Sequence, residues 1–195
     1  RRHVARSGDC GIPVLTVEEA MRRALELAVS PDAPRGVNPR VGCVLIDADG
    51  ALLASGHHRG AGTPHAEVDA LARAGSSARG ATAVVTLEPC RHTGRTGPCT
   101  QALIEAGVSR VVYAQSDPTE RAAGGAQVLR AAGIDVVGGV LAAEAEAVNR
   151  AWTHVQRMHR PLVTIKTAVS LDGRVADAGG GPTALTGAEA RAFVH

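Results

Sequence analysis

Residues 65–99 read HAEVDALARAGSSARGATAVVTLEPCRHTGRTGPC, and the rest of the chain is organised around them. The periodicity predicts a helix that begins at about His65, and the apolar, β-rich run 83–87 predicts a short strand. Pro98 is typical of a helix start, so the next helix is expected to have Cys99 in its first turn. Two helix starts are therefore expected to face the carboxyl end of one strand, where sites form in open α/β sheets.

One imidazole, two thiols and one carboxylate in this stretch indicate a zinc site with His65, Cys90 and Cys99 as ligands and Glu67 beside them. Catalytic zinc sites keep three protein ligands and one open position. Residues two apart on a helix do not share a face, so His65 and Glu67 can border one pocket only in the first turn. The alternative is a closed structural zinc site, for which His92 is the best fourth ligand.

The segments on either side predict an α/β fold in three layers, α/β/α, with a mixed, largely parallel central sheet. The sequence TVEE at 16–19 is a capping box that starts a helix ending before Pro31. The other expected elements are a hairpin of strands 41–47 and 51–56, strands at 110–114 and 134–137, a helix at 122–132 and one long helix from 141 to about 158.

Three regions are expected along the 195 residues, which can bury one good core with an attached piece. Residues 1–15 are basic and aperiodic, and we interpret them as a loose head. Residues 16–159 form the domain with the site. A new β-rich run at 161–169 and a helical start after Thr186 indicate that residues 160–195 are the truncated start of a second domain, too short for a core of its own.

Composition restricts the possible partners and the compartment. The net charge is +2, and the only aromatic residues are Tyr113, Trp152 and Phe193, too few for the stacking platforms of single-stranded nucleic-acid binders. No signal peptide and no apolar run of membrane-spanning length is visible, so a reduced, cytoplasmic setting without membrane contact is expected. There, paired cysteines usually bind metal; Cys10 is interpreted as an idle thiol and Cys43 as a buried, inert one.

The chain resembles the bifunctional deaminase/reductase family of riboflavin biosynthesis, from about residue 16 to 186. The H-x-E and P-C signatures are those of zinc base deaminases, although eight residues, not two, separate the two cysteines. The segments with the resemblance are Asn38-Pro39-Arg40-Val41-Gly42-Cys43, His65-Ala66-Glu67-Val68, Thr86-Leu87-Glu88-Pro89-Cys90 and His92-Thr93-Gly94-Arg95-Thr96-Gly97-Pro98-Cys99.

The resemblance implies a cytidine-deaminase-like fold and a small-molecule substrate, 2,5-diamino-6-ribosylamino-4(3H)-pyrimidinone 5′-phosphate. Water replaces its ring amine, with Zn²⁺ activating the water and Glu67 transferring protons. The residues implied to contact substrate are Asn38, His58, His92, Arg95 and Asp117. A basic cluster of His92 and Arg95 suits the phosphate, although an ordinary solvated loop fits the spacing as well. Thr119 stands where many members have Asn.

The second region departs further from the family. The usual Ser-x-Trp-Ile-Thr-Gly is replaced by Pro182-Thr183-Ala184-Leu185-Thr186-Gly187, so NADPH is expected only where a complete reductase domain is present. Ala168 falls at a position that contacts this cofactor in the family. The β-rich run 161–169 is expected either to dock on the first domain or to pair with a second copy, and a homo-oligomer, with a dimer favoured, is the expected assembly.

Two other hypotheses remain open on the sequence. One is a deaminase of another small base, nucleoside or nucleotide in a secondary-metabolite pathway. The other is a non-catalytic, zinc-stabilised binding module, which would give the carboxyl group of Glu67 no chemical role.

Overall fold

The computed structural model describes residues 13–94, 97–176, 178–181 and 186–194. The chain divides into two compact units, one ending at Pro161 and one running from Leu162 to His195. Each unit is described by itself. Cys10, Arg95 and residues 182–185, about which the sequence makes predictions, lie outside the described residues.

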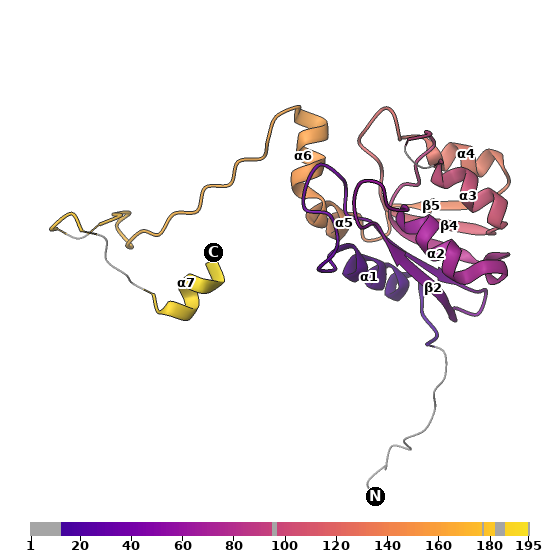
Figure 1. The fold of residues 1–195 in the computed structure, drawn as a ribbon, viewed down its shortest axis with the longest axis horizontal. Coiled ribbons are helices and arrows are strands. Elements are labelled where there is room, and N and C mark those ends of the chain that lie inside the picture. Colours follow the sequence, from indigo (N-terminus) through magenta and orange to yellow (C-terminus); the bar gives the residue numbers. More distant parts are fainter. Residues whose placement is uncertain (1–12, 95–96, 177, 182–185, 195) are drawn as a thin grey trace, which may run out of the picture. The chain divides into compact units, whose positions relative to one another are not determined.

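The first unit is built on a mixed five-stranded sheet with the strand order β2-β1-β3-β4-β5. β1 is antiparallel to both of its neighbours, whereas β3, β4 and β5 are mutually parallel. Four of the five strands therefore point the same way, which confirms the expected largely parallel sheet (Figure 1). The strands are β1 (Gly42–Ile46), β2 (Leu52–His57), β3 (Thr82–Leu87), β4 (Arg110–Gln115) and β5 (Asp135–Gly138).

This strand order brings several loops to one edge of the sheet. Because β1 runs against the others, its amino end meets the carboxyl ends of β2, β3 and β4. The segments that leave this edge are the loop before Gly42, the loop after His57, the loop after Leu87 and the loop after Gln115. These four loops contain the sequence-predicted site residues Asn38, His58, Cys90 and Asp117.

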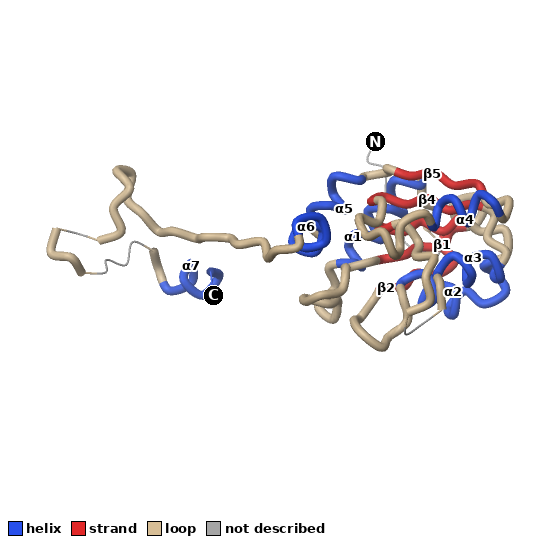
Figure 2. The backbone as a smooth tube through the Cα atoms, turned by 90° about the horizontal axis from the view of Figure 1, so that it is seen from above, coloured by secondary structure: helices blue, strands red, loops and turns tan. Residues whose placement is uncertain are grey.

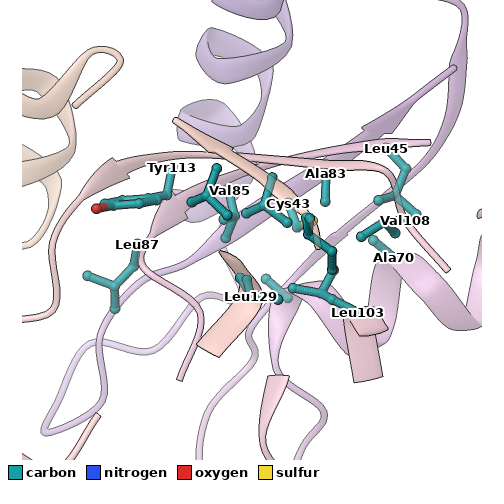
Figure 3. Packing of buried hydrophobic residues seen from close by; sticks show 14 of the residues in the cluster. Cys43, Leu45, Ala70, Ala83, Val85, Leu87, Leu103, Val108, Tyr113 and Leu129 are labelled. Atoms are coloured by element: carbon teal, nitrogen blue, oxygen red, sulfur yellow. The ribbon is translucent and has the colours of Figure 1, made fainter. Parts of the chain in front are cut away.

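Helices cover both faces of the sheet, as Figure 2 shows. Neighbouring strand residues point to opposite faces, so Val85 packs into one cluster and Val84 into the other. The first cluster, drawn in Figure 3, is covered by α2 (Ala66–Ala74), α3 (Cys99–Ala106) and α4 (Gly125–Ala131), which contribute Ala70, Leu103 and Leu129. The second is covered by α1 (Val17–Ala28) and α5 (Ala142–Val148). The three-layer fold is thus confirmed.

Helix α1 begins as the capping box predicts. The Glu19 N–H donates to the Thr16 hydroxyl at 3.2 Å, and the Thr16 N–H donates to the Glu19 carboxylate at 2.8 Å. The helix packs very closely on the sheet at Gly42, where a Cβ atom would lie 1.9 Å from the Ala24 carbonyl oxygen. Only glycine leaves room for this contact between α1 and β1.

The long helix expected over 141–158 is instead two helices, α5 (Ala142–Val148) and α6 (Arg150–Met158), interrupted at Asn149. The Asn149 amide accepts from the Arg40 N–H at 2.8 Å and donates to the Arg40 carbonyl at 2.9 Å. Its backbone has φ −102° and ψ 16°, outside the helical range. A buried tertiary contact therefore overrides an Ala/Glu-rich helical sequence.

Helix α4 also differs, because it begins at Gly125 and not at Ala122. Residue Gly124 has φ +90°, which ends the preceding turn. The remaining short element of this unit is the 3₁₀ turn η1 (Gly75–Ala78), which follows α2.

The β-rich run 161–169 is not in a strand in the structure, and its pairing with a second copy stays a prediction. Val163 and Ile165 are 74% and 81% exposed. A strand needs a partner for its backbone N–H and C=O groups, and no described strand pairs with this segment. The element described in the second unit is α7 (Ala188–Val194), after Gly187 as expected. None of the helices in the described ranges is long and apolar enough to cross a membrane.

Candidate metal centre

His65 is the N-cap of α2 and has an extended backbone, with φ −68° and ψ 161°. Its carbonyl accepts from the Asp69 N–H at 2.9 Å, so it closes the first turn without being helical itself. The side chain is therefore directed past the end of the helix. This geometry lets His65 and Glu67 border one site although they are two residues apart, as the sequence predicts.

Cys90 and Cys99 meet because α3 begins beside the loop that follows β3. The Cys99 N–H, at the start of α3, donates to the Cys90 sulfur at 3.4 Å, and the Thr100 N–H donates to the Cys90 carbonyl at 3.2 Å. A hydrogen bond from the Cys99 side chain, together with one from His65, lowers the pKa of Cys90 to about 4. The same contact and burial raise the pKa of Cys99 well above its ordinary value. Cys90 is therefore readily deprotonated to the thiolate, and a bound metal ion would also deprotonate Cys99.

The three donor atoms form a compact cluster. His65 Nδ1 lies 3.1 Å from Cys99 Sγ and 3.6 Å from Cys90 Sγ, and all three atoms lie within 4.8 Å of one another. Tetrahedral zinc with Zn–S near ~2.3 Å and Zn–N near ~2.0 Å separates its ligand atoms by roughly 3.5–3.8 Å. The donor set and its spacing fit zinc. His92, the candidate fourth ligand, is not part of the cluster found among the described residues.

Glu67 is 4% exposed and lies beside the cluster. Burial raises its pKa, as does the charge of Cys90, whereas His65 lowers it. A carboxyl group next to a metal site can act as both proton acceptor and proton donor. With this burial, Glu67 is not a solvated surface charge.

His58 and His92 each have a distinct setting. The His58 ring is 5.4 Å from the His65 ring, nearly edge-on, and its Nδ1 donates to the Pro64 carbonyl at 3.1 Å. Burial lowers the pKa of His58, which favours the neutral ring, whose Nε2 can accept a hydrogen bond. His92 is half-buried, and its Nδ1 is buried without a hydrogen-bond partner within the described part of the chain.

Asp117 follows β4 and is held by Thr119. Its Oδ1 accepts from the Thr119 N–H at 2.8 Å and from the Thr119 hydroxyl at 2.6 Å. Burial raises the pKa of Asp117, and the neighbouring Glu88 and Cys90 raise it further. The two hydrogen bonds from Thr119 therefore orient Asp117.

The other residues singled out in the sequence lie in different parts of the chain. Asn38 is half-buried in the loop before β1, at the same edge of the sheet. Arg95 lies outside the described residues. Ala168 is exposed in the second unit. Cys43 is fully buried in β1, and burial raises its pKa well above the ordinary value, as expected for an inert thiol.

The sequence reasoning missed Glu88, which is 7% exposed. Its carboxylate accepts from the backbone N–H groups of Asp117, Gly124 and Ala126, at 3.3, 3.2 and 2.9 Å. A sequence signal was present, because an acidic residue directly after a buried strand must find hydrogen-bond donors if it stays buried. Which donors it finds depends on the tertiary structure.

Comparisons with known proteins agree with this site. Residues 15–115 match the family described as cytidine and deoxycytidylate deaminase zinc-binding region. The chain is 48% identical over 179 residues to the riboflavin biosynthesis protein RibD of Escherichia coli, an alignment that covers 91% of this chain and 48% of that protein.

Solved structures show the same likeness. The RibD of Acinetobacter baumannii superposes with a TM-score of 0.83 at 45% identity, covering 91% of this chain and 50% of that one. A diaminohydroxyphosphoribosylaminopyrimidine deaminase/5-amino-6-(5-phosphoribosylamino)uracil reductase from Thermotoga maritima also gives 0.83, at 39% identity, covering 91% and 51%. The chain spans about half the length of the relatives it matches.

The sequence match covers more than half of the chain and contains all three metal-binding side chains. The likeness to RibD structures extends over nearly the whole chain. The chain belongs to the cytidine and deoxycytidylate deaminase zinc-binding family, with His65, Cys90 and Cys99 as its zinc ligands.

Proposed function

We propose that residues 16–159 catalyse the hydrolytic deamination of 2,5-diamino-6-ribosylamino-4(3H)-pyrimidinone 5′-phosphate to 5-amino-6-ribosylaminouracil 5′-phosphate and ammonia. The observation with most weight is the group of three zinc-ligating side chains found among the described residues, with the buried carboxyl group of Glu67 beside it. The likeness to a Thermotoga enzyme named for this deaminase activity supports the choice of substrate. Residues 160–195 would then be the beginning of a reductase-like domain.

A zinc ion held by His65, Cys90 and Cys99 would supply Lewis acidity, which lowers the pKa of water to near neutrality. Glu67 accepts the proton of the attacking water at its carboxylate. It passes this proton to a ring nitrogen, then accepts the second proton of the water from the hydroxyl group of the tetrahedral intermediate and delivers it to the departing amine, which leaves as ammonia. The raised pKa of Glu67 suits this role, because the group must be able to hold the proton between the two transfers.

The other side chains at this edge of the sheet would bind and orient the substrate. The His58 ring lies beside that of the zinc ligand His65, and its Nε2 would accept a hydrogen bond from the substrate. The buried Nδ1 of His92 has no hydrogen-bond partner among the residues that the structure describes, and Arg95 lies in the same loop of the sequence between the two cysteines. A phosphate held there would fix the ring over the metal, and orientation of this kind can supply several kcal/mol of the barrier. Asn38 and Asp117 would complete the contacts.

The test is incubation of the zinc-loaded protein with the diaminopyrimidine phosphate, followed by mass spectrometry of the pyrimidine and an ammonia assay. We expect conversion of an amine to an oxygen substituent, with one ammonia released per turnover. The dephosphorylated compound and the Arg95→Glu variant are the controls for phosphate recognition. Arg95→Glu should raise KM for the phosphorylated substrate and hardly change it for the dephosphorylated one. Turnover of a different base or nucleotide alone, or the absence of any turnover, would contradict the proposal.

A further inference from the structure

The segment Glu88–Arg91 contains the zinc ligand Cys90, and its other residues contact the loop that follows β4. We infer that Glu88 is a positioning residue, which fixes Asp117 relative to the zinc ligands. The importance of Asp117 for substrate binding rests on the proposed function. The mechanical link between Glu88 and Asp117 rests on the contacts of the structure alone.

Glu88 connects the ends of two parallel strands. Its own N–H donates to the Gln115 carbonyl at 2.8 Å, which extends the pairing of β3 with β4 by one step. Its Oε2 accepts from the Asp117 N–H at 3.3 Å. The backbone of Asp117 is thus tied to a residue only two positions before the zinc ligand Cys90.

The other carboxylate oxygen of Glu88 holds the far end of the same loop. Oε1 accepts from the Gly124 N–H at 3.2 Å and the Ala126 N–H at 2.9 Å, at the start of α4. The two oxygens therefore fasten both ends of the 117–126 loop. Backbone N–H groups at a helix start are natural partners for a carboxylate, and such charge-assisted hydrogen bonds are stronger than neutral ones.

The residues after Glu88 contact the same loop. A Cβ atom on Gly125 would lie 1.8 Å from the Pro89 carbonyl oxygen, so the start of α4 packs directly on this peptide. The guanidinium group of Arg91 donates to the carbonyl oxygens of Ala123 and Glu120. Cys90 lies between these contacts, and the loop with Asp117 can hardly shift unless the segment with the zinc ligand shifts too.

Replacement of Glu88 by glutamine affects the contacts at the two ends of the loop differently. The glutamine oxygen can still accept from Gly124 and Ala126, which preserves the start of α4. Its NH₂ group then faces the Asp117 N–H, so two donors oppose each other. Glu88→Gln therefore keeps the volume of the side chain while it releases Asp117 selectively.

The experiment is a double-mutant cycle of Glu88→Gln and Asp117→Asn in the zinc-loaded protein. Glu105→Gln, an exposed residue on α3, makes the same charge change and serves as the matched control. In the background with Asp117 we expect Glu88→Gln to raise KM about tenfold with kcat changed less than about threefold. In the Asp117→Asn background it should change KM less than about twofold, because Glu88 acts on substrate binding through Asp117 and that contact with substrate is already impaired.

Amide hydrogen exchange gives a second measurement that needs no substrate. Glu88→Gln should speed exchange of residues 117–124 and leave α3 and the zinc content unchanged. Additive effects on KM, unchanged exchange in the loop, or loss of zinc would each overturn the inference. If the native protein does not turn over the pyrimidine, the proposed function fails, and the exchange result alone decides the role of Glu88. If Glu88→Gln does not fold, Glu88→Asp, which keeps both oxygens but shortens their reach, takes its place, and the same double-mutant cycle and the exchange of residues 117–124 decide the inference.

Discussion

At the scale of single residues, Glu67 is the group whose chemistry is most directly open to test. Glu67→Gln preserves the shape of the side chain and removes the proton acceptor, so turnover should fall by ~10²–10⁴-fold. Zinc content and the unfolding temperature should stay close to those of the native protein, because Glu67 is not among the zinc ligands. Metal analysis and ammonia release are measured on one preparation; near-normal rates would assign the proton transfer to another group.

Thr119 offers a matched pair of variants. Its hydroxyl donates to Asp117 Oδ1 at 2.6 Å. Thr119→Val keeps the shape but loses this bond, and we expect KM for the pyrimidine phosphate to rise about two- to tenfold. Thr119→Ser keeps the hydroxyl and should behave much like the native protein. Equal KM values for the two variants would show that the hydroxyl does not orient Asp117.

At the scale of elements, Asn149 joins the break between α5 and α6 to the loop before β1. Asn149→Ala removes both hydrogen bonds to Arg40 and leaves two backbone groups without these partners, so it should lower the free energy of unfolding by about 1–3 kcal/mol. Denaturant titration measures this change. Glu146→Ala, which removes only an exposed ion pair with Arg157, is the control and should cost less than about 1 kcal/mol. A similar loss in both variants would mean that Asn149 contributes no more than a surface residue.

At the scale of the whole molecule, the second unit is too small to bind a nicotinamide cofactor and a substrate together. Such a site in an α/β domain needs several strands and their loops, and a segment of this length cannot bury a core. We expect the 195-residue protein, mixed with the deaminated product and NADPH, to leave the absorbance of the reduced cofactor unchanged. Consumption above background that depends on the protein, in a preparation free of longer forms, would contradict this. The expected homo-oligomer remains a prediction.

The sequence alone determined the features that depend on neighbours along the chain. The capping box at Thr16 places the start of α1, and Pro64 and Pro98 place His65 and Cys99 at helix starts. The apolar runs place the five strands within one or two residues. Imidazole and thiol groups at these positions made His65, Cys90 and Cys99 candidate ligands, and the resemblance to zinc deaminases implied the same set. Local hydrogen bonding and periodicity are encoded within a few residues, which is why they can be read without a structure.

Only the tertiary structure decided the contacts between distant residues. Asn149 meets Arg40 across 109 positions and interrupts a helix that the local sequence favours, and Glu88 meets Ala126 across 38 positions. The run 161–169 has the composition of a strand but lacks a described partner, and backbone pairing, not composition, makes a strand. The physical reason is the same in each case: a buried polar group or an extended backbone must find a hydrogen-bond partner, and the folding of the whole chain determines which partner it finds.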